Sequence, residues 1–311
     1  MSKNLNKVTS AGLVIALGII YGDIGTSPLY VLNEIISGRE ISELLIIGSL
    51  SCIIWTLTLQ TTFKYVILTL KADNKGEGGT LAMLSQLSTK IRDGRKGVLG
   101  FTVFLFLMAA AMEFSDGILT PAISVISAVE GIKTINPELE YLVVPITVLI
   151  LAVLFTFQFK GSQRLGNIFG PVMVLWFITI SVIGISQIVQ NPESLLALNP
   201  GYAIGFVVDH GFQTLFVMAS VILAVTGAEA LFADLGHFGR GPIRIGWFGL
   251  AGIALPLSYF GQGALILRDP SAIGNSFFGM VAPGLPALLL LLITTFATII
   301  ASQALISAVA S

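Results

Sequence analysis

The first apolar segment of the chain is interrupted by the stretch Tyr21-Gly22-Asp23-Ile24-Gly25-Thr26-Ser27-Pro28. The two glycines weaken a helix, and Pro28 suits the first turn of a new helical segment for which Thr26 or Ser27 is a suitable cap. Backbone carbonyls freed at such a break are ligands for a desolvated monovalent cation. The stretch therefore predicts a broken membrane helix at an ion site. A Pro-kinked span with an incidental Asp23 is the alternative.

The composition excludes a soluble globular protein. Of 311 residues, 55% are hydrophobic and 11% are charged, whereas soluble domains carry about 25% charged residues. The net charge of −1 offers no basic surface for nucleic acid. The single cysteine, Cys52, cannot form an internal disulfide, and no Cys or His spacing suggests a metal centre. The chain is therefore expected to lie in a lipid bilayer.

Eight segments are long and apolar enough to span a bilayer, which takes about 20 residues. They cover residues 11–36, 44–70, 99–131, 139–159, 166–189, 212–236, 245–268 and 284–310. Their continuous apolar character favours helices over barrel strands, which alternate in hydropathy. With a cytoplasmic N-terminus, twelve Lys and Arg fall on the inner side and three on the outer side, as positive-inside topology requires. The sequence predicts an all-α, multi-pass membrane protein with its N-terminus in the cytoplasm.

The longest inner connection, residues 71–97, contains apolar residues at helical spacing between Thr80 and Ile91. This spacing predicts a short amphipathic helix at the membrane interface or against the bundle. A gating role for the connection is the alternative.

Four carboxylates lie within the predicted spans, namely Asp23, Glu113, Asp116 and Glu229. Ionisable groups in the hydrocarbon zone usually face a partner or a water-filled path, and no Lys or Arg lies deep in any span. Acids without basic partners indicate a site for a cation, a proton, or both.

The third predicted span carries a polar stripe. Asp116, Thr120 and Ser124 recur at i, i+4 and i+8, so they share one helix face, and Pro121 removes a backbone donor beside them. The stripe indicates the lining of a path or a cation site. Hydroxyls that only bond back to their own helix are the alternative.

The sixth span contains a second break at Thr226-Gly227-Ala228-Glu229, in a helix that runs opposite to the first span. Interrupted helices at corresponding positions of two oppositely oriented halves indicate an inverted-repeat transporter with a midplane site. Spans one to five would form the first repeat, and span six would open the second.

These stretches resemble the Kup/HAK/KT family of potassium uptake permeases. The resemblance is carried by residues 16–30, the loop Asp73-Asn74-Lys75-Gly76-Glu77-Gly78-Gly79, residues 118–125 and residues 227–234. It implies a LeuT/APC-like fold with five-plus-five inverted repeats, about twelve spans and a cytosolic C-terminal domain. The present sequence would then be a transporter domain over residues 1–311, truncated after about eight transmembrane helices.

The resemblance also implies residue roles. The potassium-binding positions would be Asp23, Tyr30, Asp116, Thr120, Ser124 and Thr226. Glu229 matches the acid associated with proton coupling. The helix breaks lie at Gly22, Gly25, Pro28 and Gly227.

The expected function is potassium uptake across the cell membrane, as a K+:H+ symporter working by alternating access. Its partners would be K+ and H+ as substrates and the lipid bilayer, with a homodimer possible and no cofactor. An amino acid or polyamine permease of the same fold and a cation channel are the alternatives. An enzyme is not expected, because no nucleophile, base or metal constellation occurs within the spans.

Overall fold

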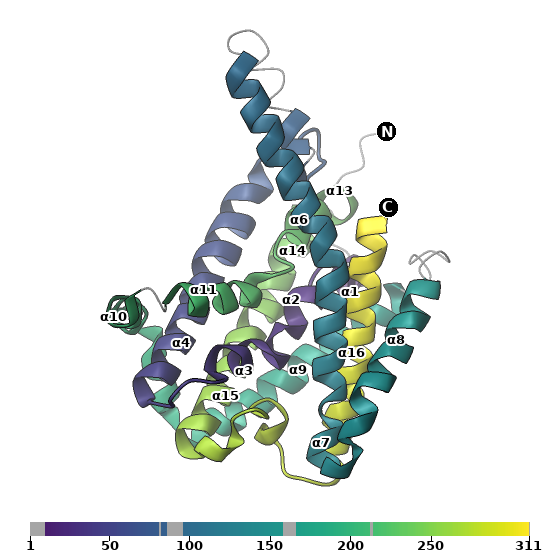
Figure 1. The fold of residues 1–311 in the computed structure, drawn as a ribbon. Coiled ribbons are helices and arrows are strands. Elements are labelled where there is room, and N and C mark those ends of the chain that lie inside the picture. The colour runs from purple at the N-terminus through teal and green to yellow at the C-terminus, as the bar shows by residue number, and fades with distance from the viewer. Residues whose placement is uncertain (1–9, 81, 86–95, 158–165, 212–213, 311) are drawn as a thin grey trace.

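Helices make up most of the computed structural model, which describes residues 10–80, 82–85, 96–157, 166–211 and 214–310 (Figure 1). Within these ranges there is no β-strand, and the single isolated bridge joins Asn74 to Glu77. The expectation of an all-helical protein is confirmed.

Among the described residues, seven helices are long and apolar enough to cross a membrane, and a bent pair brings the number to eight. The bent pair combines α1 (Ser10–Ile19) with α2 (Gly22–Thr26) and η1 (Ser27–Leu29); the others are α4 with η2 (Glu43–Thr56, Leu57–Leu68), α6 (Lys96–Val129), η4 with α8 (Pro137–Leu142, Val143–Phe157), α9 (Gly166–Gln190), α11 with η9 and α12 (Thr214–Ile222, Leu223–Val225, Ala230–Ala233), α14 with η10 and α15 (Arg240–Gly246, Trp247–Ala251, Gly252–Arg268), and α16 (Leu285–Ala310). The shorter elements include α3 (Val31–Ile36), η3 (Thr69–Lys71), α7 (Ile132–Ile135), η7 (Pro192–Leu198), α10 (Pro200–His210), α13 (Leu235–Phe238), η11 (Pro270–Ala272) and η12 (Phe278–Met280).

Glycines bring the central helices into close contact. α9 packs against both α1 and α15. A Cβ on Gly18 would lie 2.6 Å from the Gly170 nitrogen, and a Cβ on Gly261 would lie 2.5 Å from the Gly184 Cα. Small residues at membrane-helix interfaces permit backbone-to-backbone packing of this kind. The high glycine content therefore serves the tight core around α9.

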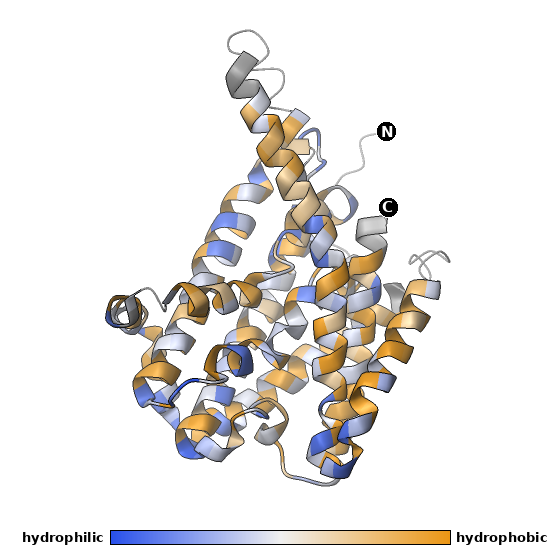
Figure 2. Ribbon diagram, viewed as in Figure 1, coloured by the Kyte–Doolittle hydropathy of each residue, from blue (hydrophilic) through white to orange (hydrophobic). Residues whose placement is uncertain are grey.

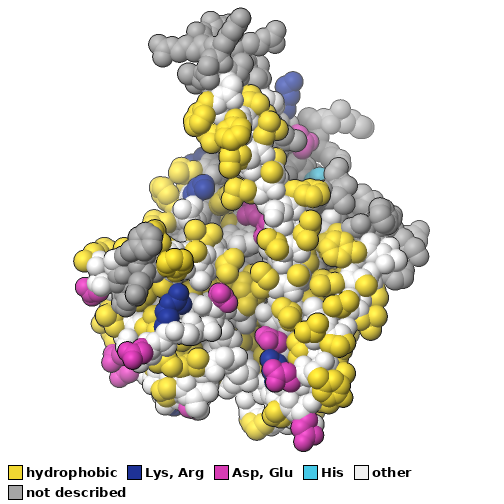
Figure 3. Space-filling model, viewed as in Figure 1, with side chains coloured by type: hydrophobic (Ala, Val, Ile, Leu, Met, Phe, Trp, Pro, Cys, Tyr) yellow, Lys and Arg dark blue, Asp and Glu magenta, His cyan; other side chains and the backbone are white. Residues whose placement is uncertain are grey.

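The outer face of the bundle is apolar. α6 runs along one side and extends beyond the other helices, with α16 and α8 beside it (Figures 1 and 2). Its exposed side chains include Phe101, Phe104, Leu107, Met112 and Phe114. Hydrophobic side chains cover most of this face, and charged groups gather mainly near its lower end (Figure 3). A continuous apolar surface of this extent suits contact with lipid.

The first span is broken before Asp23. The axes of the two parts differ by 61°, and the break falls at Tyr21, which has φ −96° and ψ 0°. Pro28 occupies the first turn of η1, as predicted. The predicted side-chain cap is wrong, because the Thr26 hydroxyl donates to the Asp23 carbonyl and the Ser27 hydroxyl donates to the Leu223 carbonyl. Thr26 keeps a helical conformation, so α2 runs directly into η1 without a free N-terminus to cap.

Candidate ion site

Three of the four predicted acids meet in the interior. One carboxylate oxygen each of Asp23, Asp116 and Glu229 lies within 4.8 Å of the other two. Asp23 comes from α2, Asp116 from the middle of α6, and Glu229 from the turn just before α12. In the part of the chain that the structure describes, none of the ion pairs formed by Lys or Arg involves any of these three acids. Three carboxylates this close repel one another strongly in a low-dielectric interior, so a cation or a proton would relieve them.

Two of the carboxylate oxygens have no hydrogen-bond partner among the described groups. They are Oδ2 of Asp23 and Oδ2 of Asp116, and both are buried. The Asp23 side chain is only 5% exposed. A buried, unpartnered carboxylate oxygen is costly, so these two atoms indicate a place for a positively charged ligand.

The breaks in the first and sixth spans face each other. Thr226 to Glu229 form a turn between η9 and α12, and Gly227 in this turn has φ +87°. A Cβ at Gly227 would lie 2.5 Å from Asp23 Oδ2 and 2.8 Å from the Ile24 nitrogen. The Gly227 N–H donates to Glu229 Oε1 at 3.3 Å. Only glycine combines this conformation with this approach, so Gly227 brings the two acids together.

The polar stripe of α6 faces the broken first span. The Thr120 hydroxyl donates to Asp116 Oδ1 at 2.5 Å, and the Ser124 hydroxyl lies 3.1 Å from that of Thr26. Thr120 is 5% exposed and Ser124 is 1% exposed. Ser124 therefore contacts the broken first span, whereas the Thr120 hydroxyl bonds within its own helix, to a carboxylate of the site rather than to a backbone carbonyl.

The remaining predicted ligands differ in their surroundings. Tyr30 lies between η1 and α3 and is 8% exposed, and its hydroxyl interacts with the Ser27 and Ser124 side chains. Thr226 is half-buried in the turn beside Gly227. Its backbone N–H donates to the Leu223 carbonyl at 3.4 Å, and no side-chain hydrogen bond is recorded for it within the described residues. Tyr30 therefore belongs to the same cluster through its own side chain. Thr226 lies near the cluster because the adjacent Gly227 approaches Asp23.

Two backbone carbonyls of the broken span accept hydrogen bonds from side chains of other helices. The Trp176 indole N–H donates to the Gly25 carbonyl at 2.9 Å, and the Gln262 amide donates to the Pro28 carbonyl at 2.9 Å. The Gln262 bond joins α15 to the broken first span, so it is an interhelical hydrogen bond. A tryptophan in an apolar span is by default a packing or interface residue, and here Trp176 also supplies a hydrogen-bond donor. The one sequence signal for its role is that a buried indole N–H needs an acceptor.

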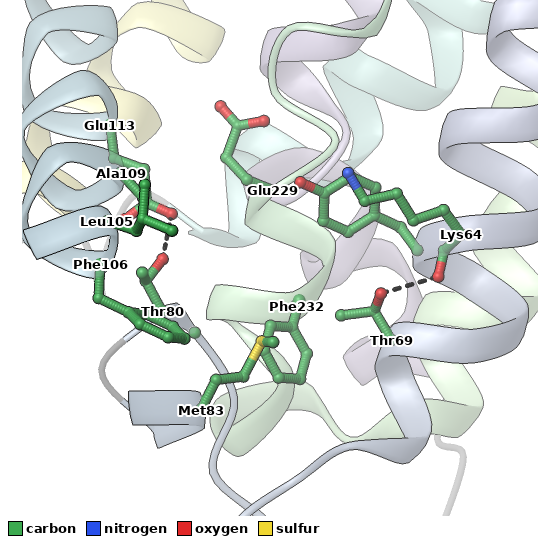
Figure 4. A pocket seen from close by; sticks show the side chains of 12 residues that line it. Lys64, Thr69, Thr80, Met83, Leu105, Phe106, Ala109, Glu113, Glu229 and Phe232 are labelled. Atoms are coloured by element: carbon green, nitrogen blue, oxygen red, sulfur yellow. Dashed lines mark hydrogen bonds between the residues drawn. The ribbon is translucent and has the colours of Figure 1, made fainter. Parts of the chain in front are cut away.

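The fourth acid, Glu113, lies outside the group of three. It lines a neighbouring cavity of about 320 Å³, and its Oε1 accepts a hydrogen bond from the Thr80 hydroxyl at 2.6 Å (Figure 4). Glu229 lines the same cavity, so the cavity reaches the group of three acids at that residue.

Comparison with known families decides what kind of protein carries this site. Residues 10–311 match the family described as the K+ potassium transporter integral membrane domain. The chain belongs to this potassium transporter family. The family consists of ion transporters, so the expectation that the chain is not an enzyme is confirmed. Family membership and the apolar helices together make it a multi-pass integral membrane protein.

Named relatives of this potassium transporter family are similar over almost the whole chain. A "Probable potassium transport system protein Kup" of Rhodopseudomonas palustris (strain HaA2) is 49% identical over 310 residues, which is 99% of this chain and 49% of the relative. A "Probable potassium transport system protein Kup 2" of Paramagnetospirillum magneticum is 48% identical over 96% of this chain and 46% of the relative. A Legionella pneumophila (strain Corby) relative named "Probable potassium transport system protein Kup 1" is 48% identical over 97% of this chain and 47% of the relative.

The chain spans about half the length of these relatives. No solved structure matches it.

Proposed function

We propose that the protein containing this chain takes up K+ across the cell membrane together with H+, by alternating access. The observation that carries this proposal is the group of three carboxylates, with two buried oxygens that lack partners. Potassium transport is what the names of the relatives state.

The ion would be held by oxygens from three segments, namely the broken first span, α6, and the turn between η9 and α12. Asp23 and Asp116 would supply carboxylate oxygens, and hydroxyls would complete the shell. Those hydroxyls belong to Tyr30, Thr120, Ser124 and Thr226. Oxygen ligands of this kind replace the hydration shell of a monovalent cation. The Gly25 and Pro28 carbonyls already accept hydrogen bonds, which favours side-chain oxygens as the main ligands.

Glu229 is the proposed proton carrier. It lies beside Asp116 and lines the cavity, so it contacts both the ion site and a route out of it. A proton on Glu229 would relieve part of the repulsion among the three acids while the cation occupies the site, so that the two ions are carried inward together, and Glu229 would release its proton on the cytoplasmic side. Shared electrostatics of the three acids would thus couple the two ions.

The architecture we propose is the LeuT/APC-like five-plus-five inverted repeat with a cytoplasmic N-terminus. It is supported by the facing breaks beside Asp23 and Gly227 and by the excess of Lys and Arg in the predicted inner connections.

Uptake of ⁸⁶Rb⁺ tests this function. The full-length protein and its Asp23→Asn variant are expressed in potassium-uptake-deficient cells, and uptake is followed with and without an inward proton gradient. We expect saturable uptake that rises with the gradient, and a fall of about tenfold or more in the variant, because a buried charge–ion contact is lost.

Glu138→Gln is the matched control, because Glu138 is an exposed acid in η4, away from the three-acid group. Rubidium uptake that does not saturate would favour a channel. Absence of uptake in every variant would contradict potassium transport and make amino acids and polyamines the next substrates to test.

A further inference from the structure

A cavity lies beside the ion site and offers the ion a route to it. One acid in the wall of this cavity, Glu113, is not part of the ion site. The walls come from η2, the segment around Thr80, the N-terminal half of α6, and α12 (Figure 4). Its polar lining comprises Lys64, Tyr65, Thr69, Thr80, Glu113 and Glu229. We call this cavity the vestibule.

One end of the vestibule is the ion site. Glu229 belongs to both, and Glu113 stands on α6 three residues before Asp116. That separation is less than one helical turn, about 4.5 Å along the axis, and it leaves both acids on neighbouring faces. Two carboxylates, Glu229 of the ion site and Glu113, therefore line a course through the vestibule that begins beside Asp116.

The other end of the vestibule is formed by the segment after η3. Gly79, Thr80 and Met83 line it, and Gly78 packs directly on the Phe232 carbonyl. The same segment is joined to the start of α14 by an ion pair between Asp73 and Arg240. The course from the ion site thus leads toward the predicted inner connection.

Like the three acids of the ion site, Glu113 has no basic partner among the described residues. Its recorded partner is the Thr80 hydroxyl, a neutral donor. Lys64 lines the vestibule too, but its ammonium lies over the Tyr65 ring, 5.1 Å from the centroid. An acid in a membrane span that faces a cavity without a paired cation is a functional candidate.

We propose that Glu113 is a cation-selecting residue of the vestibule, through which the ion passes between the three-acid site and the inner side. The passing cation takes the place of the Thr80 hydroxyl at the Glu113 carboxylate, which concentrates cations and repels anions in the vestibule. This inference rests on the proposed function, which supplies the ion.

The first test is a kinetic comparison by ⁸⁶Rb⁺ uptake in cells expressing the full-length protein. We expect Glu113→Gln to lower the maximal rate about fivefold or more while leaving the KM for external Rb⁺ within about twofold, because the residue acts after the ion has bound. Glu113→Asp restores part of the rate, and Glu138→Gln is the control for removal of a remote acid. Equal rates in the wild-type protein and Glu113→Gln would overturn the proposal.

A second test does not depend on transport. Ala109 lines the vestibule one turn before Glu113. The cysteines of the full-length protein, the buried Cys52 among them, are replaced by alanine so that a cysteine at position 109 is the single reporter. In inside-out vesicles, Ala109→Cys is treated with a cationic or an anionic methanethiosulfonate. The ratio of the two rates is normalised to that of free cysteine.

We expect the cationic reagent to be favoured about threefold or more, and we expect Glu113→Gln to remove most of that preference. The same ratio with and without Glu113→Gln would contradict the proposal. If rubidium uptake fails in every variant but the ratio shifts, the proposed function fails and the charge selection by Glu113 stands.

Discussion

The broken segment formed by α1 and α2 and the continuous helix α6 each supply one aspartate to the ion site. All five residues of α2 are buried, whereas α6 carries many exposed apolar side chains around Asp116. Asp23 is therefore oriented by neighbours from other helices, while Asp116 is oriented by the regular spacing of its own helix. The comparison teaches that one half of the site depends on tertiary packing and the other half on local periodicity.

The largest expected effect comes from adding a methyl group where the two breaks meet. In Gly227→Ala, the new Cβ would lie 2.5 Å from Asp23 Oδ2, at a backbone φ of +87° that alanine disfavours. We expect ⁸⁶Rb⁺ uptake to fall to background, because the Asp23 carboxylate has to move.

Gly205→Ala is the matched control for that change. Gly205 lies within α10, and a Cβ there would meet nothing within 4 Å. Its uptake should stay close to the wild-type rate. Normal uptake in Gly227→Ala would show that the Asp23 carboxylate can be displaced without loss of transport.

A smaller effect is expected on the α6 side. Thr120→Val removes the hydroxyl that donates to Asp116 Oδ1 at 2.5 Å, but the helix keeps Asp116 in place. We expect the KM for Rb⁺ to rise about tenfold, the lower end of the effect expected when a hydrogen bond to a charged group, worth about 1.5–3 kcal/mol, is lost. Thr120→Ser keeps the hydroxyl and should restore the wild-type KM. A KM in Thr120→Val that matches the wild-type value would argue against a role for this hydroxyl.

The smallest effect on transport is expected from the support behind α2. Trp176→Phe keeps a buried aromatic ring but removes the N–H that donates to the Gly25 carbonyl. The free energy of unfolding should fall by about 1–3 kcal/mol because a buried carbonyl loses its partner. Uptake at low temperature should change less than about threefold.

Thermal unfolding of the purified protein measures this loss. Trp55→Phe is the comparison, because the Trp55 indole also donates to a backbone carbonyl, that of Leu198, but at an exposed position. Equal destabilisation by the two changes would mean that burial around α2 adds nothing to this hydrogen bond.

Much of the fold was predictable from local properties of the sequence. Long apolar runs predict membrane helices because a bilayer requires about 20 apolar residues. The spacing of Asp116, Thr120 and Ser124 predicts one helix face, and the structure places Thr120 beside Asp116 and Ser124 beside Thr26. The run of Gly and Pro around Asp23 predicts a break, and the structure contains one, although its kink falls at Tyr21.

Other features depended on long-range contacts. The predicted cap at Thr26 failed because α2 continues into η1. The sequence did not show that Glu113 lies apart from the other three acids. That separation depends on how distant segments pack to form the vestibule. The role of Trp176 depends on which carbonyl its indole meets across the interface of α9 with the first span.

The sequence by itself determined which segments enter the membrane, where two of them break, and which acids and hydroxyls share a helix face. Those properties follow from hydropathy and from the repeat of the helix, and both act over a few residues. Only the tertiary structure decided that Asp23, Asp116 and Glu229 meet within 4.8 Å, because three helices distant in the chain must pack at glycine contacts to bring them together.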